Sequence, residues 1–155
     1  LEKSWFYRKI QSGKHKRDVE VVFDWGKQTA TYSNFGTKRE PVTIPDQTFD
    51  PVSSFYRMRT VDFKPGDQLS FSVTDGKKCF IQKARVIERQ KISLSTRTYD
   101  TFLIKVDVDH FSGVFEKSKN ASVSLWVTAD ERKIPVRIKV KVFIGSVIFD
   151  LVSAQ

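Results

Sequence analysis

The stretch Ile134-Pro135-Val136-Arg137-Ile138-Lys139-Val140-Lys141-Val142 decides the fold of this chain. From Ile134 onward, β-branched apolar residues stand at every second position, and basic residues fill the later gaps between them. A period of two is typical of a β-strand that has one face in the core and the other in water. The stretch therefore predicts a half-buried strand, apolar inward and basic outward. Pro135 has no N–H, so we expect it at the start of the strand or on an unpaired side.

The segments on either side repeat this period. Residues 123–127 and 147–151 both place apolar side chains at alternate positions, with Trp126 as an exception on the polar face. Residues 129–132 supply a polar turn, and Gly145 stands where a chain reversal needs a positive φ. Three consecutive strands joined by hairpins predict an antiparallel meander.

The rest of the chain follows the same plan, with strands expected near 5–9, 19–23, 29–32, 69–73 and 102–108. Asp75-Gly76 suits a two-residue reversal, and the apolar phase slips between Ile81 and Val86, as a β-bulge would cause. The fold class is therefore all-β, mainly an antiparallel meander that forms a curved sheet or a partly open barrel.

One segment, residues 50–59, favours a short α-helix instead. Asp50 suits the N-cap and Pro51 the first helical position. Four side chains then fall on one helical face: Val52, Phe55, Tyr56 and Arg59.

Length and composition bound the architecture. The 155 residues fit a single β-rich domain, residues 1–155, and no apolar run is long enough to cross a bilayer. Cys79 is the only cysteine, which excludes an internal disulfide and a zinc-cysteine cluster. It stands at an apolar strand position, so we interpret it as a packing residue rather than a nucleophile.

The net charge of +9 favours anionic partners. Two basic clusters are candidate contacts for anionic head groups, and a solvated basic surface is the preferred alternative. Nucleic acid is the less favoured partner, because Trp126 and Phe143, the aromatics that could accompany such charges, are better explained by packing. The candidate residues are Lys14, Lys16, Arg17, Arg137, Lys139 and Lys141.

No pattern in the sequence points to catalysis. His15 and His110 are the only histidines, and neither a G-x-S-x-G elbow nor a phosphate-binding glycine motif occurs. Asp107, Asp109 and His110 are close in sequence, but a charged strand end explains them better than a metal site does. We therefore predict no catalytic residue, no metal and no cofactor, and expect a protein that is not an enzyme.

Several short motifs stand out along the chain: Asp50-Pro51-Val52-Ser53, Tyr56-Arg57-Met58-Arg59, Pro65-Gly66, Asp75-Gly76-Lys77, Trp126-Val127, Asp130, Arg132, Ile134-Pro135-Val136-Arg137 and Gly145-Ser146-Val147. Together they resemble one bacterial family, the uncharacterised exported proteins called domain of unknown function 3108. The resemblance implies a β-rich fold and a periplasmic or envelope location in Gram-negative bacteria, and it implies no activity. Family members normally carry further strands before the position of Leu1, so we expect an N-terminally truncated domain.

Three functions follow as hypotheses, in order of preference. The first is a non-enzymatic envelope protein whose curved sheet, closed by the 50–59 helix, binds a lipid-like or other hydrophobic ligand. The second is a structural or interaction module that pairs an exposed sheet edge with its own copy or with an envelope partner. The third is a glycan-acting enzyme that uses carboxylates such as Asp107, Asp109 or Glu116.

Overall fold

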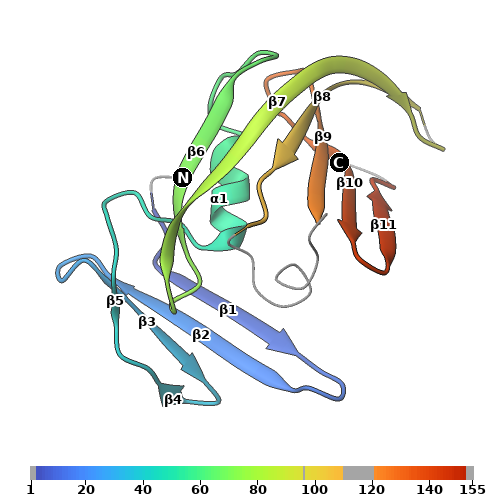
Figure 1. Cartoon of the computed structure of the whole chain (residues 1–155). Coiled ribbons are helices and arrows are strands. Elements are labelled where there is room, and N and C mark those ends of the chain that lie inside the picture. The colour runs from blue at the N-terminus through green and yellow to red at the C-terminus, as the bar shows by residue number, and fades with distance from the viewer. Residues whose placement is uncertain (1–2, 96, 110–120, 153–155) are drawn as a thin grey trace. The chain divides into compact units, whose positions relative to one another are not determined.

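A computed structural model describes residues 3–95, 97–109 and 121–152 of the chain. It contains two antiparallel sheets and one short helix, and the sheets do not close into a barrel (Figure 1). The predicted all-β class is therefore confirmed, in its open form. The chain divides into two compact units, residues 1–60 with 71–81 and residues 61–70 with 82–155. The prediction of a single domain stays a prediction.

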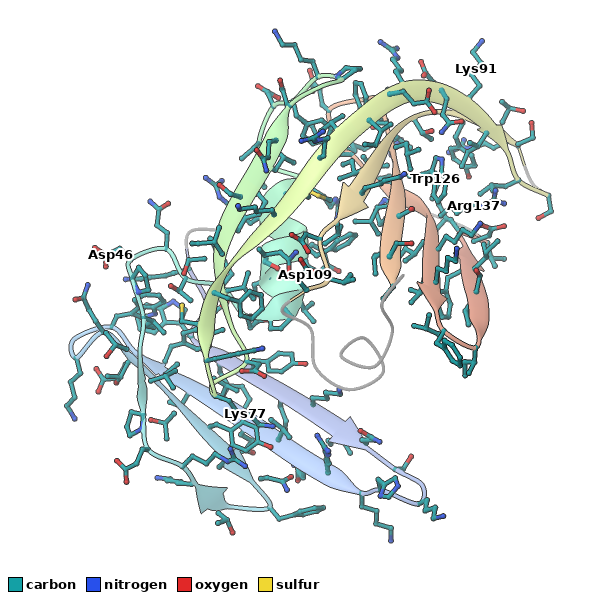
Figure 2. The ribbon with its side chains drawn as sticks, in the orientation of Figure 1. Asp46, Lys77, Lys91, Asp109, Trp126 and Arg137 are labelled. Atoms are coloured by element: carbon teal, nitrogen blue, oxygen red, sulfur yellow. The ribbon has the colours of Figure 1, made fainter. Side chains whose placement is uncertain are left out.

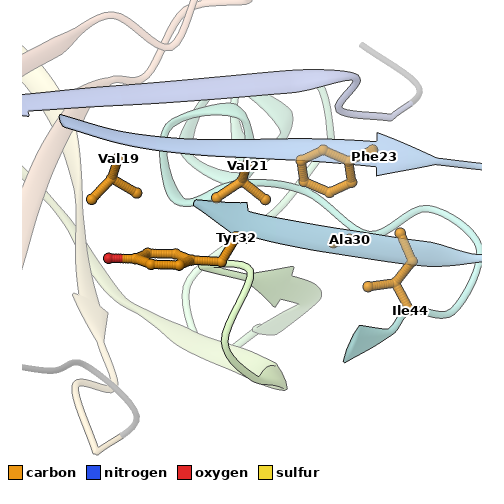
Figure 3. Packing of buried hydrophobic residues seen from close by; sticks show 6 residues of the cluster. All are labelled: Val19, Val21, Phe23, Ala30, Tyr32 and Ile44. Carbon is orange, nitrogen blue, oxygen red and sulfur yellow. The ribbon is translucent and has the colours of Figure 1, made fainter. Parts of the chain in front are cut away.

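The first unit contains the five-stranded sheet. Its strands follow the order β1-β2-β3-β4, and β5 also pairs with β3. The predicted strands near 5–9, 19–23 and 29–32 are confirmed. Alternate side chains of β2 and β3 form a compact apolar core with Ile44 (Figure 3). The strands are β1 (Phe6–Gln11), β2 (Arg17–Asp24), β3 (Thr29–Asn34), β4 (Thr37–Lys38) and β5 (Val42–Thr43).

Gly76 shows why the first unit needs glycine at one position. Its φ is +79°, and a Cβ there would lie 2.9 Å from a methyl carbon of Val21 and 3.0 Å from Tyr32 Cβ. Both the conformation and the space exclude a larger residue. The connection around it covers residues 75–78 and is closed by the Thr74 hydroxyl, which donates to the Lys78 carbonyl at 2.7 Å. The expected two-residue reversal at Asp75-Gly76 was therefore too short.

The helix α1 (Pro51–Met58) begins as the sequence predicts. The Asp50 carboxylate accepts hydrogen bonds from the backbone N–H groups of Val52 and Ser53, and Pro51 is the first helical residue. Ser4 donates its hydroxyl to the same carboxylate at 2.7 Å, which fixes Asp50 in a buried position. The helix face that continues from Asp50 at intervals of four, Ser54 and Met58, is consequently the buried one.

The other face of α1, which the sequence had marked as its apolar face, is more exposed. Val52 and Tyr56 are each 51 % exposed. Among the residues that the structure describes, no helix has the length and apolar character needed to cross a membrane.

The six-stranded sheet is a continuous meander with the order β11-β10-β9-β8-β7-β6. Pro135 is the first residue of β10, as predicted, and the β10–β9 register shifts between Pro135 and Arg137. This sheet lies in the second unit, except for residues 71–74 of β6 and 79–81 of β7, which belong to the first unit. The strands are β6 (Gln68–Thr74), β7 (Cys79–Ser93), β8 (Thr98–Val106), β9 (Ser122–Thr128), β10 (Pro135–Val142) and β11 (Gly145–Asp150).

The β-bulge in β7 is present, but at another place than expected. Gln82, Ala84 and Val86 are all buried at alternate positions, so no phase slip precedes Val86. The register with β8 shifts instead between Val86 and Glu88. The prediction was wrong because the exposed Ile81 was counted as a core residue.

Candidate functional site

The last strand, β11, forms an edge of the six-stranded sheet. It pairs antiparallel with β10, from Val142↔Gly145 to Arg137↔Asp150, and the sheet order ends with it. Gly145 has a φ of +140°, which allows the reversal at Phe143 and Ile144. All six residues of β11 are exposed. We call β11 the open edge.

The backbone of the open edge presents hydrogen-bonding groups outward. The Leu151 N–H donates to the Val136 carbonyl at 2.9 Å, so residue 151 faces β10 with its backbone groups. Because an antiparallel ladder alternates, the residues at even positions turn their N–H and C=O groups away from β10. These residues are Ser146, Ile148 and Asp150. The open edge is thus ready to accept a further strand.

One face of the sheet carries an apolar row that reaches the open edge. The registers place Ile104, Leu125, Ile138 and Phe149 opposite one another across four strands. Ile104 is 0 % exposed and Leu125 is 4 % exposed, whereas Phe149 is 58 % exposed. A parallel row ends in Val147, which is 52 % exposed. The apolar face therefore continues from the buried residues of β8 and β9 to the exposed strand β11.

The opposite face of β10 carries the predicted basic residues Arg137, Lys139 and Lys141 (Arg137 is labelled in Figure 2). Arg137 donates from Nε to Asp150 Oδ1 at 2.6 Å and from Nη2 to Oδ2 at 2.7 Å. The hydrogen bond to Arg137 lowers the pKa of Asp150, and the same contact raises the pKa of Arg137. Lys141 is exposed and Lys139 is half-buried beside Ile148. The charge of Arg137 is therefore already compensated.

The second predicted basic cluster lies in the other unit. Lys14 and Lys16 are exposed in the connection between β1 and β2, and Arg17 is the exposed first residue of β2. The two basic clusters belong to different units. A head-group site that combines Lys14, Lys16 and Arg17 with the β10 residues therefore stays a prediction.

The other sheet edges are protected in ways that β11 lacks. β4 and β5 are each two residues long. At β6, Phe49 forms a parallel bridge with Val73, donating to the Ser72 carbonyl and accepting from the Thr74 N–H, both at 2.9 Å. Short strands and covering segments are two established ways to prevent unwanted pairing. β11 is neither short nor covered by such a bridge in the described residues.

No three side chains that could hold a metal ion gather in the described ranges. Asp107 accepts a hydrogen bond from the Asp109 N–H at 3.0 Å, which ties it to its own turn. His110 and Glu116, the other residues of the metal and glycan hypotheses, lie outside the described residues. Cys79 is half-buried, with its sulfur 3.4 Å from the Ser72 hydroxyl oxygen.

The aromatic residues weighed for nucleic-acid binding have different surroundings. Trp126 is half-buried and stands opposite Arg137 in the β9–β10 register. Phe143 is 87 % exposed at the turn before the open edge. The two residues do not share a strand. The prediction that nucleic acid is a disfavoured partner stays a prediction.

Comparison with known proteins gives one match. A family model described as "Protein of unknown function (DUF3108)" matches residues 3–152. No curated protein and no solved structure matches. The match covers both sheets and the open edge.

Proposed function

The chain belongs to the DUF3108 family of proteins of unknown function, and from this premise we propose that it is a non-enzymatic interaction module whose open edge pairs with the open edge of a second copy. The observation that supports this proposal is the exposed, apolar and unprotected strand β11. Two identical edges that pair antiparallel about a two-fold axis form one continuous sheet.

One register that suits both the backbone and the side chains centres the two-fold axis on Ile148. Ile148 would lie opposite Ile148 of the second copy, and Ser146 opposite Asp150. These are the residues whose backbone groups point outward, so they form the hydrogen-bonded pairs of the new ladder. Val147 would then stand opposite Phe149 on the apolar face. The apolar row would thus continue from one copy into the other.

The charges on β11 itself are compatible with a second copy as the occupant. The only ionisable residue of β11 is Asp150, and its carboxylate is already bonded to Arg137. In the proposed register Asp150 stands opposite Ser146, so no like charges meet. The edge is therefore complementary to itself, which is the requirement for a two-fold interface.

The expected dimer is weak. A single pair of short strands buries less than the roughly 1,200 Å² at which stable interfaces begin. We therefore expect monomer and dimer to exchange with protein concentration.

The hydrophobic-ligand hypothesis has less support. The pocket between the β7–β8 hairpin and the turn that follows β9 is lined largely by arginines and aspartates, which do not suit a lipid chain. A periplasmic or envelope location remains part of the proposal and is supported by the family resemblance alone. Fractionation of cells that produce the full-length protein tests it, and recovery in the cytoplasm would contradict it.

The experiment for the proposed function is sedimentation velocity over a concentration series. Ile148→Lys would replace the pair of facing isoleucines, a cross-strand contact worth about 0.2–1 kcal/mol, by two like charges that repel each other. We expect the dissociation constant of the dimer to rise by about tenfold or more. Ile10→Lys is the matched control, because Ile10 is an exposed apolar residue of another edge strand, β1, which has the same length as β11. A wild-type protein that stays monomeric at every concentration would contradict the proposal.

A further inference from the structure

A charged pocket lies at one end of the six-stranded sheet, within the second unit. Its volume is about 440 Å³, and it lies between the β7–β8 hairpin and the turn that follows β9. The Ala129 N–H donates to the Asp100 carbonyl at 2.9 Å, which joins the two segments. The charged lining residues are Arg89, Arg97, Asp100, Asp130 and Arg132.

Both carboxylates of the pocket are already bonded. Arg89 donates from Nε and Nη2 to Asp100, the shorter bond being 2.7 Å. Asp130 accepts the Thr128 hydroxyl at 2.5 Å and Arg132 Nε at 3.3 Å. These hydrogen bonds lower the pKa of each aspartate, so both stay ionised at neutral pH. The two acids therefore compensate two of the three arginines.

Arg97 is the arginine whose charge is not compensated in this way. Its guanidinium lies over the ring of Tyr99, 4.5 Å from the ring centre. Tyr99 is 8 % exposed and so gives the arginine a fixed support. Within the parts of the chain that the structure describes, no carboxylate lies within ion-pair distance of Arg97. The pocket as a whole thus carries one net positive charge.

We propose that this pocket binds a small organic anion, whose carboxylate or phosphate group is held by the Arg97 guanidinium. A planar guanidinium donates two parallel hydrogen bonds to either group. A volume of about 440 Å³ exceeds what a bare ion fills and falls in the range of small-molecule sites. Thr98, whose hydroxyl lies 2.9 Å from the Ser93 hydroxyl, is a further polar residue of the lining.

The test is a titration of the whole chain with three probes that share a glucopyranose ring, followed by NMR of the backbone amides. Glucuronate carries a carboxylate, glucose 6-phosphate carries a phosphate, and glucose carries no charge. We expect at least one charged probe to shift the amides of Ala129 and Asp100, and glucose to leave them unchanged. The charged probe that binds more tightly shows whether the pocket prefers a carboxylate or a phosphate group.

Two variants complete the test. Arg97→Ala removes a charge-assisted contact and is expected to weaken binding by about tenfold or more. Arg85→Ala is the matched control, because Arg85 is exposed on β7 and does not line the pocket. The proposal is overturned if neither charged probe shifts the pocket amides, if glucose binds equally well, or if Arg97→Ala binds like the wild type.

Discussion

Two edge strands of this molecule, β1 and β11, have the same length but opposite protection. Each contains six residues and each is largely exposed. β1 carries Arg8 and Lys9 at its centre, and Arg8 is bonded to Asp18 at 2.8 Å. β11 has Val147 and Ile148 at the corresponding place. Charged residues at the centre of an edge oppose pairing with another chain, and apolar residues permit it.

This difference identifies β11 as an edge strand without charged residues at its centre. Both strands expose apolar side chains, so exposed apolar area alone does not distinguish them: Ile10 is 69 % exposed and Ile148 is 51 % exposed. The distinguishing feature is the absence of a cation in β11 next to its outward backbone groups.

The largest effect is expected on stability, when the buried end of the apolar row, at Ile104, is compared with its exposed end, at Phe149. Ile104→Ala would leave a cavity in the core and lower the free energy of unfolding by about 2–5 kcal/mol. Phe149→Ala, at the exposed end of the same row, should cost less than about 1 kcal/mol. Urea unfolding at low protein concentration measures both. Equal losses would mean that Phe149 is already covered within the monomer.

A smaller effect is expected when the difference in charge between β1 and β11 is removed by substitution. Arg8→Val combined with Lys9→Val makes β1 apolar, and a background of Ile148→Lys blocks the open edge. We expect association through β1 to appear, with an association constant raised by about tenfold over the background. Arg85→Val in the same background is the control, because it adds an apolar residue within the sheet rather than at an edge. Unchanged sedimentation would show that charge is not what protects β1.

Local patterns in the sequence were sufficient to predict most elements. The period of two over residues 134–142 predicted β10, and the Asp50-Pro51 pair predicted the start of α1. These features are local, because a strand face and a helix cap depend on residues that are neighbours in sequence. Gly145 and the polar turn at 129–132 likewise determined where hairpins close.

Burial was less predictable because it depends on which strand lies next. The alternation at 147–151 resembles that at 123–127, yet Val127 is 0 % exposed while Val147 is 52 % exposed. The two segments differ in position within the sheet, and the sequence pattern does not encode that position. Ile148 was missed for the same reason, because it stands on the face that the pattern treats as polar. The lack of lysine and arginine over residues 145–149 was the signal that could have identified it.

The pairing of charged side chains across strands could not be predicted from the sequence either. Arg137 was a candidate for binding an anion, but the β10–β11 register places Asp150 opposite it. Arg97, in contrast, was not singled out, because its role depends on Tyr99 and on a turn that lies far away in sequence. Such sites arise from register and topology rather than from spacing.

Disulfide trapping at residue 148 tests the central claim most directly. In the proposed register Ile148 faces its own counterpart, and the Cα atoms of a hydrogen-bonded antiparallel pair lie about 5.5 Å apart, within the range of a disulfide. In a Cys79→Ser background, Ile148→Cys should form a covalent dimer under mild oxidation, whereas Val147→Cys and Ile10→Cys should form little. Equal trapping at all three positions, or none at residue 148, would contradict the pairing of the open edges.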